Sequence, residues 1–184
     1  LLQQWEDGDK EVRALWKKMN AWALEGFQET YKRYGTKIDK AYFESQHYEK
    51  GKALVEEGLQ KNIFTKDEKG NVICDLEEEG LGKKVVLRSD GTSIYITQDM
   101  ALAKLRYQDH KMDKMVYVVG NEQLHHFKAL FSILEKLGFP FAKNCYHLAY
   151  GMVYLPEGKM KSREGKVVDA DDLIDEVVGF ALHE

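Results

Sequence analysis

The sequence predicts an α/β fold with parallel strands. Over residues 81–184, short apolar runs alternate with amphipathic helical segments, which is typical of βαβ units. The chain has 184 residues, enough for one domain with a sizeable core or for a domain that carries an insertion. Its 43% hydrophobic and 32% charged residues are typical of a soluble globular protein rather than a disordered one.

The first 80 residues are expected to be mainly helical, with one small β hairpin. Apolar residues at helical spacing predict a long helix over residues 9–34, with Gly35 at its end. Residues 36–47 contain only short β-type stretches and turns. A second helix is predicted over YEKGKALVEEGLQK, and NIFTKDEKGNVICDL is typical of a hairpin around the turn KDEKGN.

Strands and helices then alternate to the end of the chain. The predicted strands are KVVLRS, KMVYVVG and CYHLAYGMVYL, of which the second is expected to be buried and the third to form one strand or two. The predicted helices are TSIYITQDMALAKLRYQDH, NEQLHHFKALFSILEKLG and VDADDLIDEVVGFA. Thr92 or Ser93 can cap the first of these helices, and Asp169 or Asp171 the last.

Composition excludes several classes of protein. A net charge of −4 disfavours a dedicated nucleic-acid binder, so any such contact would need a local patch. Cys74 and Cys145 lie far apart and outside any CxxC pair, which predicts reduced thiols in a cytoplasmic protein rather than metal ligands. No apolar run approaches the ~20 residues of a membrane span, and no signal-peptide pattern opens the chain.

Two polar clusters follow predicted strands, where open parallel sheets bind ligands. After KMVYVVG, the first helical turn carries Glu122, Gln123, His125 and His126. The alternative is that these residues cap the helix and face solvent. Adjacent histidines on a helix point in different directions, so at most one is expected to face a ligand and a shared metal site is not expected.

The second cluster pairs an aromatic ring with a carboxylate. Tyr95 and Asp99 are four residues apart, on one face of a helix. The ring offers a cation–π surface and the carboxylate a charge-assisted hydrogen bond, so the pair suits a cation. The alternative is a core tyrosine beside a solvated aspartate.

A basic loop lies near the end of the chain. GKMKSREGK contains Lys159, Lys161, Arg163 and Lys166 among glycines. Such a loop suits phosphates whose charge grows on a leaving group, although an exposed hairpin tip with solvated lysines is the alternative. Neither GxxxxGK[ST] nor GxGxxG occurs, so the common NTPase and dehydrogenase interpretations lose support.

Together these stretches carry a family resemblance. KMKSR after YGMVYLPEG resembles the KMSKS signature of class I aminoacyl-tRNA synthetases. LRSDGTSIYITQDMALA, VYVVGNEQLHHFKALFSIL and GKVVDADDLIDE resemble arginyl-tRNA synthetase, as do NAWALEGFQETYKRYGTKID and YFESQ. The resemblance covers nearly the whole chain. It implies a connective-peptide-like insertion over residues 1–80 and the second half of a Rossmann-like nucleotide-binding fold over residues 81–184.

The resemblance also implies two binding sites. The arginine pocket would consist of Glu44, Tyr95, Asp99 and Gln123, and these groups suit a planar guanidinium with five donors. The ATP site would comprise His125, His126, Gly151, Met152, Val153, Lys159 and Met160. Lys159, Ser162 and Arg163 would be catalytic, and no metal ligand is implied. Lys161 and Ser162 depart from the usual residues at the third and fourth signature positions.

The implied function is ATP-dependent activation of L-arginine and its transfer to tRNA(Arg) in protein synthesis. ATP would bring Mg²⁺, and a monomeric, cytoplasmic parent enzyme is expected. The His-Ile-Gly-His element and the anticodon-binding domain do not occur in this sequence. We therefore expect a central fragment that cannot aminoacylate alone. The alternatives are a non-catalytic arginine-binding or interaction module and a class I enzyme for another cationic amino acid.

Overall fold

The computed structural model describes residues 1, 4–5, 7–152, 154–155, 158–159 and 168–183. The chain divides into two compact units, one of Leu1–Ala41 with Tyr154–Glu184 and the other of Tyr42–Val153. The second unit contains the residues on both sides of the expected boundary between residues 80 and 81.

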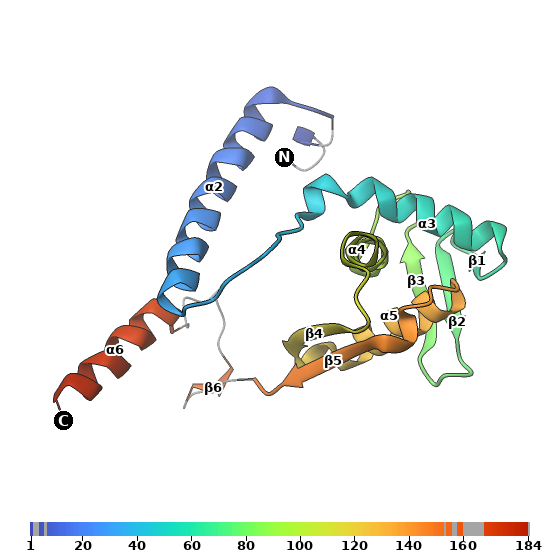
Figure 1. Cartoon of the computed structure of the whole chain (residues 1–184). Coiled ribbons are helices and arrows are strands. Elements are labelled where there is room, and N and C mark those ends of the chain that lie inside the picture. Colours follow the sequence, from blue (N-terminus) through green and yellow to red (C-terminus); the bar gives the residue numbers. More distant parts are fainter. Residues whose placement is uncertain (2–3, 6, 153, 156–157, 160–167, 184) are drawn as a thin grey trace. The chain divides into compact units, whose positions relative to one another are not determined.

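The described part of the first unit includes two long helices and a short strand pair (Figure 1). Its elements are α2 (Lys10–Arg33), α6 (Ala170–His183), β6 (Tyr154–Leu155) and β7 (Gly158–Lys159). Asp9 caps α2 by accepting a hydrogen bond from the Val12 N–H at 2.9 Å, and Gly35 follows the helix with a φ of 68°. The predicted helix and its end are confirmed.

The two helices of this unit are joined by a group of charged side chains. Arg33 donates to Asp171 Oδ1 at 2.7 Å and also pairs with Asp175. The Thr30 hydroxyl donates to Asp171 at 2.6 Å, and this bond, followed by Arg33, lowers the pKa of that carboxyl. The side chain of Asp171 is thus paired with α2. Asp169 caps α6 by accepting a hydrogen bond from the Asp171 N–H at 2.9 Å.

The second unit contains an antiparallel sheet, a parallel strand pair and three α-helices (Figure 1). The antiparallel sheet consists of β1 (Phe64–Lys66), β2 (Val72–Leu76) and β3 (Gly82–Leu87), and the parallel pair of β4 (Met115–Gly120) and β5 (Cys145–Tyr150). The helices are α3 (Tyr48–Gln60), α4 (Tyr95–His110) and α5 (Leu124–Lys136). Short 3₁₀ turns are η1 (Glu44–Gln46), η2 (Asn121–Gln123) and η3 (Ala142–Asn144).

The parallel pair confirms the predicted βαβ unit. Strands β4 and β5 run in register from Met115 opposite Cys145 to Gly120 opposite Tyr150, with α5 between them in the chain. Strand β3 was expected in this parallel sheet, and that expectation is wrong. It pairs antiparallel with β2, from Leu76 opposite Gly82 to Val72 opposite Leu87. The connection is a tight turn, which can return a strand only in the antiparallel direction.

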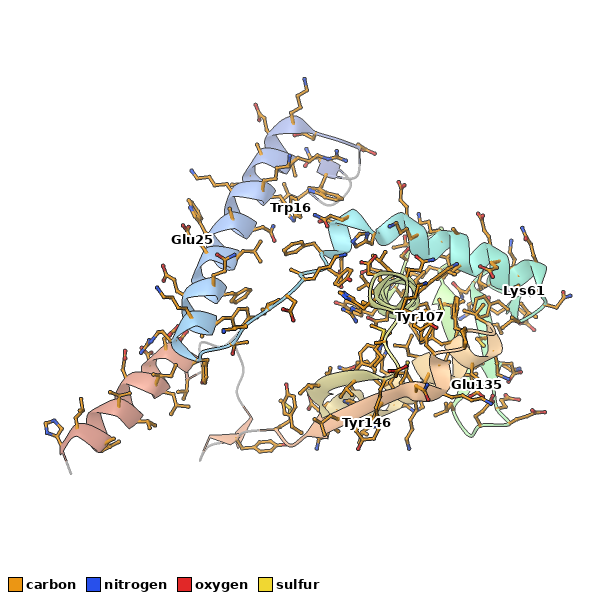
Figure 2. All side chains as sticks on the ribbon, viewed as in Figure 1. Trp16, Glu25, Lys61, Tyr107, Glu135 and Tyr146 are labelled. Carbon is orange, nitrogen blue, oxygen red and sulfur yellow. The ribbon has the colours of Figure 1, made fainter. Side chains whose placement is uncertain are left out.

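Strand β4 was predicted to be buried, but only one of its faces is. Met115 and Tyr117 are buried, with the Tyr117 ring 5.0 Å from that of Phe127 on α5. Val116 and Val118 on the other face are 47% and 63% exposed. Strand β5 likewise exposes apolar side chains, among them Tyr146 (Figure 2). Since alternate residues of a strand point to opposite faces, one face of the pair is left uncovered.

The core lies between the antiparallel sheet and helices α3, α4 and α5. Phe64, Leu76, Met100, Leu130 and Leu134 are among its largest fully buried side chains. At its edge, the Tyr107 ring of α4 stacks on Phe141 at 4.7 Å between centroids (Figure 2 labels Tyr107).

The first turn of α4 is anchored in this core. Thr97 is fully buried, and its hydroxyl donates to the carbonyl of Val86 on β3 and accepts from the Ile94 N–H at 3.1 Å. Thr92 and Ser93 were expected to cap α4, and that expectation is wrong because both belong to the preceding turn. Thr92 donates its N–H to Asp90 at 2.8 Å, and Ser93 forms a β bridge with Leu87.

Gly51 allows α3 to approach this anchored turn closely. A Cβ added at Gly51 would lie 2.7 Å from the Thr97 carbonyl oxygen, too close for any side chain. We expect Gly51→Ala to destabilise the fold by about 1–3 kcal/mol because two helices must separate. Urea denaturation followed by circular dichroism measures this change.

Gly26→Ala is the matched control. Gly26 lies within α2 with nothing within 4 Å of an added Cβ. Alanine there should stabilise the helix by up to about 1 kcal/mol. Equal effects of the two substitutions would contradict the close approach at Gly51.

The cysteines are free thiols, as predicted. Burial raises the pKa of both Cys74 and Cys145 to about 11. An unfolded thiol has a pKa of about 8.5, so at pH 8 the folded chain should hold roughly a hundredfold less thiolate. We expect iodoacetamide to modify the folded protein about that much more slowly than the urea-unfolded protein.

Because the thiol pKa is higher in the folded than in the unfolded protein, the two cysteines also lower the stability of the fold as pH rises from about 8.5 to 11.

Candidate functional site

The described candidate residues for the arginine pocket all belong to the second unit. Helix α4 supplies Tyr95 and Asp99 from its first two turns, η1 supplies Glu44, and η2 supplies Gln123. Tyr95 is 79% exposed, so it is not the core tyrosine of the alternative interpretation. An exposed ring at a helix start is free to form the wall of a binding site.

Asp99 is held by a histidine from α5. His126 Nε2 lies 2.7 Å from Asp99 Oδ2, and the two side chains are 25% and 33% exposed. The His126 ring stands edge-on to the ring of the neighbouring Phe127, with 5.4 Å between centroids and 87° between planes. The alternative of solvated helix-capping side chains therefore does not describe His126. Asp99 was predicted to bind arginine and His126 to bind ATP, and the structure places these two residues in contact.

His125 points elsewhere. It is exposed and lines a shallow hollow together with Glu79, Lys128 and Ser132. The expectation that the two histidines point in different directions is confirmed, and only His126 contacts a candidate pocket residue.

Glu44 is held from α4. With its amide nitrogen turned toward Glu44, Gln98 donates to Oε2 at 2.8 Å and to Oε1 at 3.3 Å. The segment before Glu44 is fastened to the last turn of α4, where the Tyr42 hydroxyl donates to Asp109 Oδ2 at 2.8 Å. Sequence reasoning missed Gln98. The only signal was its place beside Asp99, in a helical turn already singled out.

Gln123 stands where β4 ends and α5 begins. It occupies the N-cap position of α5, is exposed, and makes no capping hydrogen bond through its side chain. The strand before it ends at Gly120, where an added Cβ would lie 3.2 Å from the sulfur of Met152. Gly151 and Met152 follow β5, so the Met152 side chain lies at the carboxyl end of β4. Open parallel sheets bind ligands at this end.

Several predicted residues lie outside this description. Val153, Met160, Ser162 and Arg163 are not among the described residues, and neither is Lys161. Lys159 is described only as the end of β7. Across the described ranges there is no group of three or more His, Cys, Asp or Glu side chains that could hold a metal ion. None of the described helices is long and apolar enough to cross a membrane.

Comparison with known proteins gives a single family. Residues 1–184 match a family model described as tRNA synthetases class I (R), catalytic domain. The chain is 58% identical over 181 residues to an arginine–tRNA ligase of Parabacteroides distasonis, covering 98% of this chain and 30% of that protein. It is 57% identical over 183 residues to one of Treponema denticola, covering 99% and 31%. The chain thus spans about 30% of these relatives' length.

Solved structures show the same fold. An arginyl-tRNA synthetase of Plasmodium falciparum superposes with a TM-score of 0.73 at 18% identity, covering 96% of this chain and 31% of that one. The Thermus thermophilus arginyl-tRNA synthetase gives 0.54 at 22% identity, covering 70% and 27%. These likenesses confirm the predicted α/β class. Because the family model spans every residue and the relatives share over half of them, the chain belongs to the class I arginyl-tRNA synthetase family.

Proposed function

We propose that this chain is the part of an arginine–tRNA ligase that binds L-arginine and one side of ATP. The observation that supports this most is the pair of carboxylates, Glu44 and Asp99, each hydrogen-bonded to a side chain of α4 or α5. A guanidinium is planar, always charged and carries five donors, so two carboxylates with Tyr95 and Gln123 satisfy it. Lysine or citrulline would leave part of this set unpaired.

ATP is proposed to lie at the carboxyl ends of β4 and β5. His126 with the backbone of Gly151, Met152 and Val153 would contact the adenosine, whereas His125 lies in the hollow beside Glu79. Lys159 and Met160 would lie along the phosphates, with Lys159, Ser162 and Arg163 acting in the reaction. Mg²⁺ would enter on the ATP phosphates.

The proposed reaction needs no covalent enzyme intermediate. A carboxylate oxygen of arginine attacks the α-phosphorus, the bond to the bridging oxygen breaks, and pyrophosphate leaves with that bond's electron pair. Cationic side chains of the loop would stabilise the growing charge on the leaving group. A terminal ribose hydroxyl of tRNA(Arg) then takes the arginyl group and AMP leaves.

The remaining parts of the proposal concern the whole enzyme. Residues 1–80 would be a connective-peptide-like insertion, and residues 81–184 the second half of the Rossmann-like catalytic fold. The parent would be a cytoplasmic monomer whose activity needs further segments, so the isolated chain should charge no tRNA(Arg). A non-catalytic arginine-binding module would use the same carboxylates, and the exchange experiment below separates the two functions.

ATP–pyrophosphate exchange by the full-length protein tests the proposal. Exchange is expected with arginine alone among the standard amino acids, and only when tRNA is present. Exchange with lysine would mean that the pocket binds another cationic amino acid. Arginine binding without any exchange would favour the non-catalytic module.

The pocket carboxylate can be tested in the same assay. Asp99→Asn should lower kcat/KM for arginine by about 10- to 100-fold, because it removes a charged acceptor for the guanidinium. Asp113→Asn changes an exposed carboxylate between α4 and β4 and is the matched control. An unchanged kcat/KM in Asp99→Asn would remove Asp99 from the pocket.

The basic loop has its own test. Lys159→Ala should slow arginine activation with little change in arginine affinity, since its charge is proposed to act on the phosphates. Lys143→Ala, an exposed lysine 3.6 Å from Glu135, is the matched control. Pre-steady-state measurement of adenylate formation gives the rate, and wild-type kinetics would contradict the role of Lys159.

A further inference from the structure

We propose that Gln98 and His126 are positioning residues that hold the two carboxylates of the arginine pocket in place. This inference rests on the proposed function, because it takes Glu44 and Asp99 as the groups that bind arginine. Gln98 and His126 would not touch arginine themselves. Each residue would hold its carboxylate from outside the pocket. The carboxylates would then be fixed before arginine arrives.

The contact between His126 and Asp99 has a defined direction. An ionised carboxylate only accepts hydrogen bonds, so His126 Nε2 carries the hydrogen and donates to Asp99 Oδ2 across 2.7 Å. This bond uses Oδ2 and leaves Oδ1 for a ligand. The His126 ring also lies edge-on to the ring of Phe127, its buried neighbour in the helix.

The contact between Gln98 and Glu44 serves a different need. Glu44 is exposed and lies in the three-residue turn η1, so its long side chain has little else to restrict its rotation. The Gln98 amide nitrogen reaches both of its oxygens, at 2.8 and 3.3 Å. A primary amide has two N–H groups, which suits this two-point contact.

The two contacts share one reference point. Gln98 and Asp99 directly follow Thr97, which is fully buried and bonded to Val86 on β3. Gln98 thus extends from an anchored turn, and His126 meets the same turn from α5. A guanidinium fork demands fixed acceptors, because small displacements of a bidentate partner weaken both bonds. The anchored turn thus positions both carboxylates, which come from different segments, relative to the same part of α4.

Arginine affinity of the full-length protein tests the inference, measured by calorimetry together with KM values from exchange. His126→Ala and Gln98→Ala should each weaken arginine binding about tenfold, and Gln98→Ala should leave the KM for ATP unchanged. His126→Gln keeps an N–H donor at similar reach and should restore most of the affinity. Gln98→Glu places a like charge beside Glu44 and should weaken binding more than Gln98→Ala does.

Gln108→Ala is the matched control, an exposed glutamine further along α4 that should bind arginine like the wild type. Wild-type affinity in His126→Ala and Gln98→Ala would overturn the inference and leave the arginine pocket standing. A raised KM for ATP with wild-type arginine affinity in His126→Ala would restrict His126 to the nucleotide and overturn its positioning role. A wild-type protein that does not bind arginine would overturn the proposed function and this inference with it. If either alanine variant fails to fold, the arginine affinities of His126→Gln and Gln98→Glu relative to wild type test the inference instead.

Discussion

The anchoring of the first turn of α4 is the constraint on which the second unit depends. Thr97 is a buried polar residue, and burial of a hydroxyl is tolerated only when it is hydrogen-bonded. Its bonds to Val86 and Ile94 join helix to sheet, and Gly51 lets α3 pack against the same turn. Core packing on one side of α4 thereby fixes the polar residues on its other side.

Helix positions could be predicted well from the sequence, because each helix carries a periodic apolar face and polar ends. Gly35 and Asp169 end or begin their helices as expected. Strand partners were harder to predict. The sequence KVVLRS fits pairing with β2 and pairing with β4 equally well. Only the tight turn before it determines that it pairs with β2.

The candidate site shows the same limit. The i, i+4 spacing was enough to predict that Tyr95 and Asp99 lie on one helix face. It could not show that His126 from another helix meets Asp99, or that Gln98 meets Glu44, because these contacts depend on how α4, α5 and η1 pack. The hydrogen bond between Thr97 and Val86 was equally invisible, since a threonine in a helix is usually solvated or bonded within its own helix.

The parallel pair β4 and β5 has a consequence for synthesis of the chain. Its partners Met115 and Cys145 are only 30 residues apart, and α5 is the sole α-helix between them in the described chain. Such a local unit can form on the ribosome as soon as Tyr150 has emerged. From that moment its uncovered face presents Val116, Val118, Tyr146, Leu148 and Tyr150 to the surroundings. Until another surface covers it, this apolar face favours association with other apolar surfaces.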